Sequence, residues 1–236
     1  DKNKKKKREN SILDLIGLQK QANRYPHQLS GGQQQRVAVG RALAPNPVAI
    51  LMDEPFSNLD RQLRSSLSRE IREIIKFSGI TAILVTHDRE EAMVLSDRVG
   101  VLVSGKLIQI DEPEKLYRFP CSLEVVRMIS ESRLLEGEAK NNYIDTEIGR
   151  IGKEKFQSGG VTFKEGTSII VSIRPEDLVI RKSDSEEDGT IIRKEFSGNN
   201  LIYCVQLKSG NFLHVDSNNK ADSLFEGEKV NLDFSY

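Results

Sequence analysis

Residues 48–52 form an uninterrupted apolar run, and this run constrains the fold more than any other feature of the chain. Pro47 precedes the run and Asp53 follows it, which favours a short strand over a helix. A strand without polar alternation is typical of a parallel sheet that helices bury on both faces. Residues 80–86 repeat the pattern, and a segment with helical periodicity, residues 61–77, separates the two. The order strand, helix, strand predicts an α/β unit.

The helix at residues 61–77 is the clearest of several predicted helices. Its apolar residues recur at steps of three and four, and Ser78 and Gly79 provide a stop. A short amphipathic helix is expected from Ser11, while the lysine-rich residues 2–8 are interpreted as a solvated terminus or loop rather than a nucleic-acid arm. The other elements predicted in this half are helices at residues 33–43, 89–95, 112–117 and 122–129 and a hairpin at residues 99–110.

From about Leu134 the sequence changes to short β-rich runs separated by Gly, Asn and Asp. This pattern is typical of an all-β domain. We therefore expect an α/β portion at residues 1–120, a linker at 121–133 and a β-rich domain at 134–236. The strands predicted in this domain are residues 142–148, 168–174, 189–196, 201–207, 211–215 and 229–234.

Composition narrows the possible partners. The 35 basic side chains balance 35 acidic ones, so no global charge favours nucleic acid or an anionic surface. The apolar runs are far shorter than the roughly 18 residues that a membrane span needs, so any membrane association must come through a partner protein. Cys121 and Cys204 lie far apart without metal-ligand spacing, which favours a reducing compartment and ordinary packing roles.

Ser30, Gly31, Gly32 and Gln33 form the first candidate binding segment, at the start of a predicted helix. Two glycines let a ligand approach the backbone closely, and the amides and dipole of a helix N-terminus attract an anion. Ser30 can donate its hydroxyl, so a phosphate group fits this segment. The residues alone favour a simple N-cap, in which Ser30 serves only its own helix.

Asp53 and Glu54 follow the first predicted strand, at the edge where ligands of open α/β sheets collect. An Asp there can hold Mg²⁺ through water, and an adjacent Glu can take a proton from an attacking water. His87 follows the second predicted strand and can converge with Glu54 on one site. The alternatives are a helix cap or a solvated loop for the two carboxylates and a structural hydrogen bond for His87.

Four motifs together resemble those of the ABC transporter ATPases. They are Leu-Ser-Gly-Gly-Gln at residues 29–33, Ile-Leu-Met-Asp-Glu at 50–54, Ser-Asn-Leu-Asp at 57–60 and Thr-His-Asp at 86–88. In that family they correspond to the signature, the Walker B strand, the D-loop and the switch histidine. Two positions depart mildly from the family pattern, Asn58 and Gly40, where the family commonly has alanine.

The resemblance implies the site as well as the fold. The fold is α/β, a partial P-loop NTPase with a RecA-like parallel sheet and a helical subdomain, and its cofactors are ATP and Mg²⁺. Glu54 and His87 would be catalytic, and Asp53 would hold the metal. The implied ATP contacts are Ser30, Gly31, Gly32, Gln33 and Asp60.

The second half adds a subclass. Residues 171–176, Val-Ser-Ile-Arg-Pro-Glu, resemble part of the OB-like β-barrel of importer ATPases that serve iron(III), sugars, polyamines or oxyanions. The resemblance implies an ATP-hydrolysing importer subunit at the cytoplasmic face of the membrane, with a lean to iron(III). The implied partners are a second copy or a paired ATPase subunit, transmembrane permease subunits and, indirectly, a periplasmic or extracellular solute-binding protein, with no nucleic acid.

The 236 residues contain no phosphate-binding loop of the form Gly-x-x-x-x-Gly-Lys-Ser/Thr. Residues 100–106 have the spacing, but Leu107 replaces the hydroxyl residue and the context is a strand. In the family this loop lies upstream of the signature, and the first residue here is Asp1 rather than Met.

We therefore expect part of a longer subunit, one that alone neither binds ATP tightly nor hydrolyses it. Its remaining strands should expose faces that neighbouring strands normally bury. The alternative is a non-catalytic regulatory or ligand-binding module on an ATPase scaffold.

Overall fold

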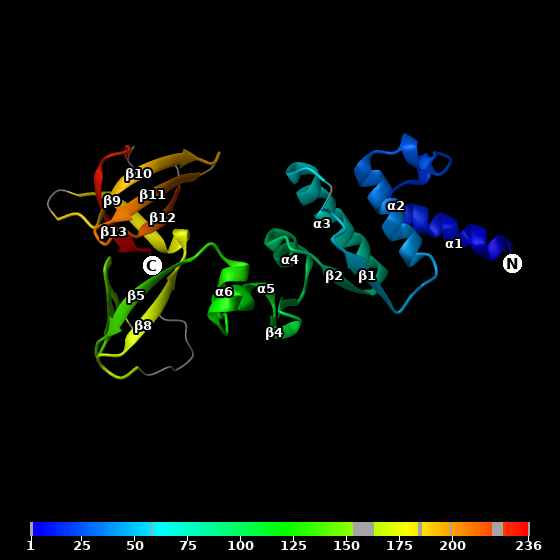
Figure 1. Ribbon diagram of the computed structural model, residues 1–236. Helices are drawn as coiled ribbons and strands as arrows, with labels where there is room; N and C mark the ends of the chain where they lie inside the picture. Colours follow the sequence, from blue (N-terminus) through cyan, green and yellow to red (C-terminus); the bar gives the residue numbers. More distant parts are fainter. Residues whose placement is uncertain are drawn as a thin grey trace. The chain divides into compact units, whose positions relative to one another are not determined.

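The computed structural model describes residues 2–57, 59–152, 163–183, 186–198, 200–218 and 224–235. The chain divides into two compact units, residues 1–116 and residues 117–236. The first unit contains helices and a parallel strand pair, and most of the second unit is β-structure (Figure 1). The predicted fold class, α/β structure followed by β-structure, is thus confirmed. Within the described residues, no helix has both the length and the apolar character that crossing a membrane requires.

The first unit begins with two helices and then alternates strands with helices. Gly79 ends its longest helix in the left-handed conformation, with φ at +67°, as the stop signal predicts. The elements of this unit are α1 (Lys2–Leu15), η1 (Gln19–Gln21), η2 (Pro26–Gln28), α2 (Gly31–Leu43), β1 (Ala49–Asp53), α3 (Arg61–Ser78), β2 (Thr81–Val85), α4 (Arg89–Leu95), β3 (Val99–Val103), β4 (Lys106–Asp111) and α5 (Pro113–Arg118), the last of which runs into the second unit.

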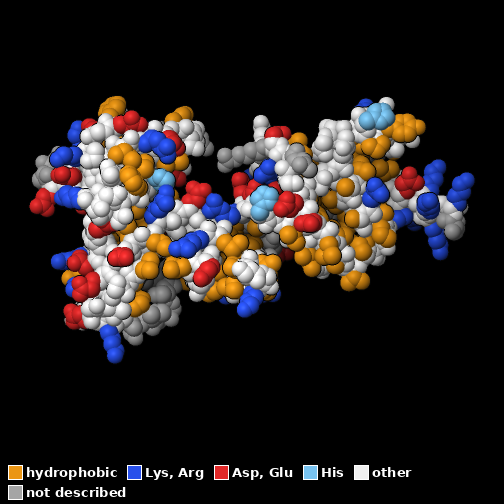
Figure 2. Space-filling model, in the orientation of Figure 1, with side chains coloured by type: hydrophobic (Ala, Val, Ile, Leu, Met, Phe, Trp, Pro, Cys, Tyr) orange, Lys and Arg blue, Asp and Glu red, His pale blue; other side chains and the backbone are white. Residues whose placement is uncertain are grey.

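β1 and β2 pair in parallel, and one face of the pair is buried. The core on that face includes Leu43 of α2, Ile50 of β1, Leu67 and Ile71 of α3, and Phe56 of the turn after β1. On the other face Leu51, Ile83 and Val85 are 78%, 54% and 58% exposed. Figure 2 shows hydrophobic side chains gathered over these strands.

The expected burial of residues 48–52 on both faces is therefore wrong. The described elements cover only the face that Ile50 and Met52 share, and the intervening residues of β1 are exposed. This sheet thus has the exposed strand face that the sequence predicts.

The lysine-rich start is helical, and its lysines are exposed on α1, as Figure 2 shows at the N-terminal end. Lysine has a good helix propensity, which explains why α1 begins earlier than Ser11. Arg8 also has a structural role, because its Nε donates to Ala44 O at 3.0 Å and its Nη2 to Leu43 O at 2.7 Å. These bonds satisfy carbonyls at the C-terminus of α2.

Gly40 allows α1 and α2 to approach closely. A Cβ atom at this position would lie 3.0 to 3.2 Å from side-chain atoms of Ile12 and Ile16. That spacing is tighter than ordinary van der Waals contact, so the two isoleucines account for a glycine where the family commonly has alanine.

The second unit consists mainly of two antiparallel sheets, in the orders β7-β6-β5-β8 and β12-β11-β10-β13-β9. Both sheets contribute to one core, which includes Leu135, Ile144, Ile191, Tyr203 and Val215. The elements are α6 (Leu123–Ile129), β5 (Arg133–Ala139), β6 (Tyr143–Thr146), β7 (Gly149–Gly152), β8 (Ser168–Ile173), η4 (Pro175–Asp177), β9 (Leu178–Lys182), β10 (Gly189–Phe196), β11 (Asn200–Leu207), β12 (Phe212–Asn218) and β13 (Lys229–Phe234).

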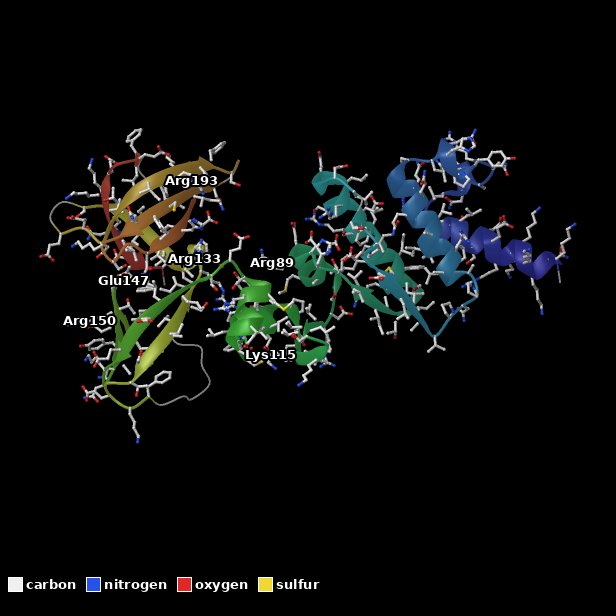
Figure 3. The ribbon with its side chains drawn as sticks, viewed as in Figure 1. Arg89, Lys115, Arg133, Glu147, Arg150 and Arg193 are labelled. Carbon is white, nitrogen blue, oxygen red and sulfur yellow. The ribbon has the colours of Figure 1, made fainter. Side chains whose placement is uncertain are left out.

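Several details of this unit differ from the sequence prediction, which contained no strand at β5, β7 or β9. Residues 142–148 do not form one strand, because β6 and β7 make a hairpin that Gly149 permits with φ at +115°. Arg150, labelled in Figure 3, lies over the ring of Tyr143 at 4.7 Å in this hairpin. Cys204 is buried but Cys121 is exposed, so the expected packing role fits only Cys204.

Candidate functional site

The first candidate site lies at the carboxyl ends of β1 and β2. Asp53 and Val85 are the last paired residues of the parallel ladder, and the chain continues from them into Glu54 and Thr86. The side chains that follow the two strands meet, because His87 Nδ1 lies 2.9 Å from Glu54 Oε1. The expected convergence of Glu54 and His87 is thus observed.

The Glu54 carboxylate raises the pKa of His87 above its ordinary value. The largest contribution is the hydrogen bond between the two side chains, and the charge of Glu54 adds to it. The charges of Asp88 and Glu91 act in the same direction, against a small opposing effect of burial. Since a carboxylate only accepts hydrogen bonds, Nδ1 is the donor, and protonation of the ring strengthens the pair.

Glu54 adopts an unusual backbone conformation, with φ at +43°. Non-glycine residues rarely occupy this region, and such strain persists where surrounding contacts hold it. Here Glu54 N–H donates to Val85 O at 2.8 Å, and the hydroxyl of Ser57 donates to Glu54 O at 3.1 Å. The turn therefore fixes the direction in which the carboxylate leaves the sheet.

Asp53 is the exposed last residue of β1, directly before Glu54. No group of three or more metal-binding side chains occurs in the described part of the chain. An ion at Asp53 would therefore need water and ligand oxygens for the rest of its shell, which is the mode of binding that Mg²⁺ prefers.

The Ser30 to Gln33 segment forms a complete capping box at the start of α2. Ser30 Oγ accepts from Gln33 N–H at 3.4 Å, and Gln33 Oε1 accepts from Ser30 N–H at 3.1 Å. The N-cap alternative is therefore correct as a description of the fold. It leaves the amides of Gly31 and Gly32 without a partner inside the helix, so an anion can still be received there.

Neither of these glycines is required by the local fold. Both lie outside the left-handed region. A Cβ atom on Gly31 would lie 3.7 Å from Leu59 Cδ2, and one on Gly32 would lie 3.6 Å from Leu63 Cδ1, which are ordinary contacts. Gly31 is exposed, so a phosphate can approach its backbone, whereas Gly32 is buried and its missing side chain would face Leu63 and Leu67.

Asp60 is the N-cap of α3, where its Oδ1 accepts from Leu63 N–H at 2.9 Å. Asn58, in the same motif, lies outside the described residues. The described contacts join Glu54 to His87 but include none from the Ser30 to Gln33 segment to either residue. The predicted residues therefore lie in three places, which are the sheet edge, the start of α2 and, for Asp60, the start of α3.

Residues 100–106, which have the spacing of a phosphate loop, belong to a β-hairpin. β3 and β4 flank Ser104 and Gly105, whose φ values of +48° and +77° suit a two-residue hairpin turn. The hairpin that the sequence predicts here is confirmed.

An ion-pair network beside His87 was not predicted. Arg64 Nη1 lies 2.8 Å from Asp88 Oδ2, and the hydroxyl of Thr86 donates to Glu91 Oε2 at 2.7 Å. Burial acts to raise the pKa of Asp88, but hydrogen bonds from the Glu91 N–H and from Arg64 hold it below its usual value. The spacing Asp88-x-x-Glu91 is the capping signal that marks this turn in the sequence. Arg89, the first residue of α4, is labelled in Figure 3.

The Arg-Pro-Glu residues of the second unit form a structural clamp around Tyr117. The Arg174 guanidinium lies 4.1 Å from the centre of the Tyr117 ring and donates to Tyr117 O. Tyr117 Oη donates to Glu176 Oε1 at 2.5 Å. Burial, followed by this hydrogen bond, raises the pKa of Tyr117 well above its usual value. The motif therefore holds the start of the second unit.

Comparison with known proteins matches both ends of the chain to families. Residues 1–57 match the ABC transporter family, and residues 171–235 match the TOBE domain.

Three curated relatives carry import ATP-binding names. The Fe(3+) ions import ATP-binding protein of Haemophilus influenzae is 39% identical over 82% of this chain and 55% of its own length. Its counterpart from Fusobacterium nucleatum is 36% identical over 94% and 60%, respectively. The spermidine/putrescine import ATP-binding protein 1 of Pseudomonas aeruginosa is 39% identical over 88% and 57%. The chain spans little more than half the length of these relatives.

Among solved structures, cbiO1 of Clostridium perfringens, part of an ABC transporter complex, aligns with a TM-score of 0.47 and 29% identity. That alignment covers 55% of this chain and 50% of the other.

Proposed function

The chain combines an ABC transporter segment with a TOBE domain, and from this premise we propose that it acts within the ATP-hydrolysing subunit of an importer for iron(III) or polyamines. The observation that carries the proposal is the hydrogen bond of 2.9 Å between His87 and Glu54 at the carboxyl edge of the parallel strands. This arrangement offers an oriented carboxylate beside a protonatable ring, which is what activation of a water molecule requires.

Glu54 is the proposed general base. Its carboxylate is 47% exposed, so water reaches it, and the strained turn holds it in one direction. His87 donates to Oε1 and leaves the other carboxylate oxygen for the attacking water. His87 thus orients the base and, when protonated, places a positive charge where negative charge develops during phosphoryl transfer.

Asp53 is the proposed metal-holding residue, because it presents an exposed carboxylate one residue before the base. ATP would supply the phosphoryl group, and Mg²⁺ would neutralise part of the negative charge of that group. The role of Asp53 is to bind the ion directly or through water at the sheet edge.

The Ser30 to Gln33 segment is proposed to complete the site of a second subunit. Its amides, its dipole and the hydroxyl of Ser30 are suited to the terminal phosphate, and the exposed Gly31 leaves room for that approach. For Asp60 we propose an ATP contact from the same part of the molecule, with its Oδ1 already engaged by Leu63 N–H. A head-to-tail dimer then joins this group of residues to the phosphate loop of the partner.

Hydrolysis is tested by fusion, since these 236 residues contain no phosphate loop. We expect no magnesium-dependent phosphate release from the chain alone. A fusion that joins the phosphate-loop segment of the Haemophilus relative to residue 2 should hydrolyse MgATP. In this fusion Glu54→Gln should reduce turnover by about 100-fold or more.

The matched control is Glu73→Gln, because Glu73 is an exposed carboxylate on α3 away from the sheet edge. It should leave turnover unchanged. A fusion in which Glu54→Gln keeps full turnover refutes the assignment of the base.

The transported solute and the partners are also proposals. Relatives named for Fe(3+) and for spermidine or putrescine support these two substrate classes. We propose transmembrane permease subunits as partners, which would place the subunit at the cytoplasmic face of the membrane. Uptake of radiolabelled iron(III) and of putrescine by cells that carry Glu54→Gln in the importer subunit distinguishes the classes, since only the true substrate should lose uptake.

A further inference from the structure

Two turns carry the side chains of the proposed site. One follows β1 and carries Glu54, and the other follows β2 and carries His87. The last backbone bond between the strands is Glu54 N–H to Val85 O at 2.8 Å, after which both turns leave the sheet. The side chains of Glu54 and His87 are 47% and 74% exposed, so packing around them does not fix their spacing.

Arg64, on the second turn of α3, is bonded to both turns. Its Nη2 donates to Leu59 O at 3.0 Å, in the segment that follows Glu54. Its Nη1 donates to Asp88 Oδ2 at 2.8 Å, one residue beyond His87. A guanidinium is planar and rigid, so two bonds from its separate nitrogens fix the distance between the groups that accept them.

Hydrogen bonds of Thr86 hold the turn at residues 86–88 together. Thr86 Oγ1 accepts from Asp88 N–H at 3.0 Å and donates to Glu91 Oε2 at 2.7 Å. The side chain of Glu91 is only 5% exposed, and Arg64 Nε lies 3.7 Å from its Oε1. A buried carboxylate needs a nearby cation, so Arg64 is held against this turn from two sides.

Arg64 does not serve mainly to fill space. It lines a cavity of about 290 Å³ together with Ser65, Ser68 and Val94 of α3 and α4, and with acidic residues of α4 and its cap. One side of the arginine therefore faces open volume, and its contacts with the turns are directional and polar.

We propose that Arg64 is a positioning residue, whose guanidinium fixes the spacing between the Glu54 turn and the His87 turn. It touches neither the proposed base nor the histidine, and it acts through Leu59 and Asp88. Its importance for hydrolysis rests on the proposed function, whereas the spacing itself is a property of the chain without nucleotide.

The chain offers a matched control on the same helix. Arg72 Nη1 donates to Leu95 O at 3.1 Å, and its Nη2 lies 3.4 Å from Asp97 Oδ1. Arg72 thus makes the same kinds of bond as Arg64, to one carbonyl and one carboxylate, and its side chain is 30% exposed against 28% for Arg64. It joins α3 to the other end of α4, far along the chain from His87.

The experiment is a double-mutant cycle read by NMR titration of the His87 ring in the 236-residue chain. The measured quantity is the fall in the pKa of His87 that Glu54→Gln causes, in the parent chain, in Arg64→Ala and in Arg72→Ala. The charges that act on His87 are those of Glu54, Asp88 and Glu91. Their direct effects are separated out, because the cycle reports only the coupling of Glu54 to Arg64.

We expect the fall in Arg72→Ala to equal that in the parent chain and the fall in Arg64→Ala to be less than half as large. Urea unfolding does not test the proposal, because Arg64→Ala leaves the buried Glu91 carboxylate unpaired and should destabilise the chain more than Arg72→Ala whether or not Arg64 positions the turns. An equal fall in Arg64→Ala overturns the proposal.

Arg64→Lys keeps the inference testable if Arg64→Ala does not fold. Lysine retains the charge beside Glu91 but presents a single nitrogen in place of the two that reach Leu59 and Asp88. A reduced fall in Arg64→Lys supports the positioning role, and an undiminished fall overturns it. The titration needs no nucleotide, so it is independent of the hydrolysis assay. If the Arg64 variants reduce the fall in the pKa of His87 but the fusion is inactive, the proposed function is rejected and the positioning role stands.

Discussion

Replacing the buried Gly32 with alanine should stabilise the chain. Gly32 lies in the first turn of α2 outside the left-handed region, so alanine adopts its conformation and removes about 0.5 kcal/mol of unfolded-state freedom. The added methyl group would lie 3.6 Å from Leu63 Cδ1 and 3.8 Å from Leu67 Cδ1. Burying one carbon contributes about 0.8 kcal/mol, so the sum is a stabilisation of about 1 kcal/mol.

Gly40→Ala is the matched control on the same helix. Its methyl group would lie 3.0 to 3.2 Å from atoms of Ile12 and Ile16, and overpacking of this kind costs about 2 kcal/mol. The better helix propensity of alanine offsets about 1 kcal/mol of this cost, so the free energy of unfolding should fall by about 1 kcal/mol. With a urea dependence of about 2 kcal/mol/M, the two variants should move the unfolding midpoint by about 0.5 M in opposite directions.

The functional half of this prediction uses the phosphate-loop fusion. Gly31 is the exposed glycine of the pair, so Gly31→Ala should lower turnover by placing a methyl group where a phosphate approaches the backbone. A Gly32→Ala chain that is less stable than the parent refutes the packing argument. A Gly31→Ala fusion that retains full turnover refutes the proposed phosphate contact.

Three further predictions concern the cap, the histidine and the open sheet face. Ser30→Ala removes the acceptor of Gln33 N–H and should lower stability by about 1 kcal/mol in urea unfolding, and an unchanged midpoint contradicts the cap. Glu54→Gln should lower the pKa of His87 in an NMR titration, because the hydrogen bond and the charge of Glu54 raise it. The pair therefore stabilises the chain fully below the unfolded histidine pKa of about 6.5 and ceases to do so above the raised folded pKa, so the unfolding midpoints of parent and variant should converge at alkaline pH. Persistent divergence there rejects this linkage. Leu51→Ser combined with Ile83→Ser should reduce self-association in light scattering, since these side chains are 78% and 54% exposed, and a parent chain that is already monomeric counts against an adhesive face.

The sequence predicted the elements with strong periodicity and the meeting of Glu54 with His87. α3 and α4 carry clear helical patterns and caps, and strands that end in polar residues bring those residues to one edge. β5 was missed because its sequence, Arg-Leu-Leu-Glu-Gly-Glu-Ala, mixes charges and a glycine into the strand. Its pairing with β8 and the core position of Leu135 outweigh that weak local preference.

The role of Arg64 could not be predicted because it depends on partners elsewhere in the chain. Asp88 lies 24 positions away, and the register of β1 with β2 places it beside α3. The helical lysines of α1 were missed although lysine has a good helix propensity, because a charged run was interpreted as a solvated terminus or loop. The bonds of Arg8 to the end of α2 link residues 35 and 36 positions apart and could not be predicted. Local patterns carry no information about such pairs.

Complementation between two inactive variants tests the central proposal most directly, namely that the Ser30 segment serves the partner's nucleotide and Glu54 serves the chain's own. In the phosphate-loop fusion, Ser30→Ala and Glu54→Gln should each abolish turnover as homodimers. A mixed dimer contains one intact site, made of Glu54 from the first variant and Ser30 from the second. Mixing equal amounts should restore about a quarter of parental phosphate release, because half of the dimers are mixed and each has one of two sites intact. Absence of any recovery in dimers that demonstrably exchange subunits would contradict the head-to-tail account.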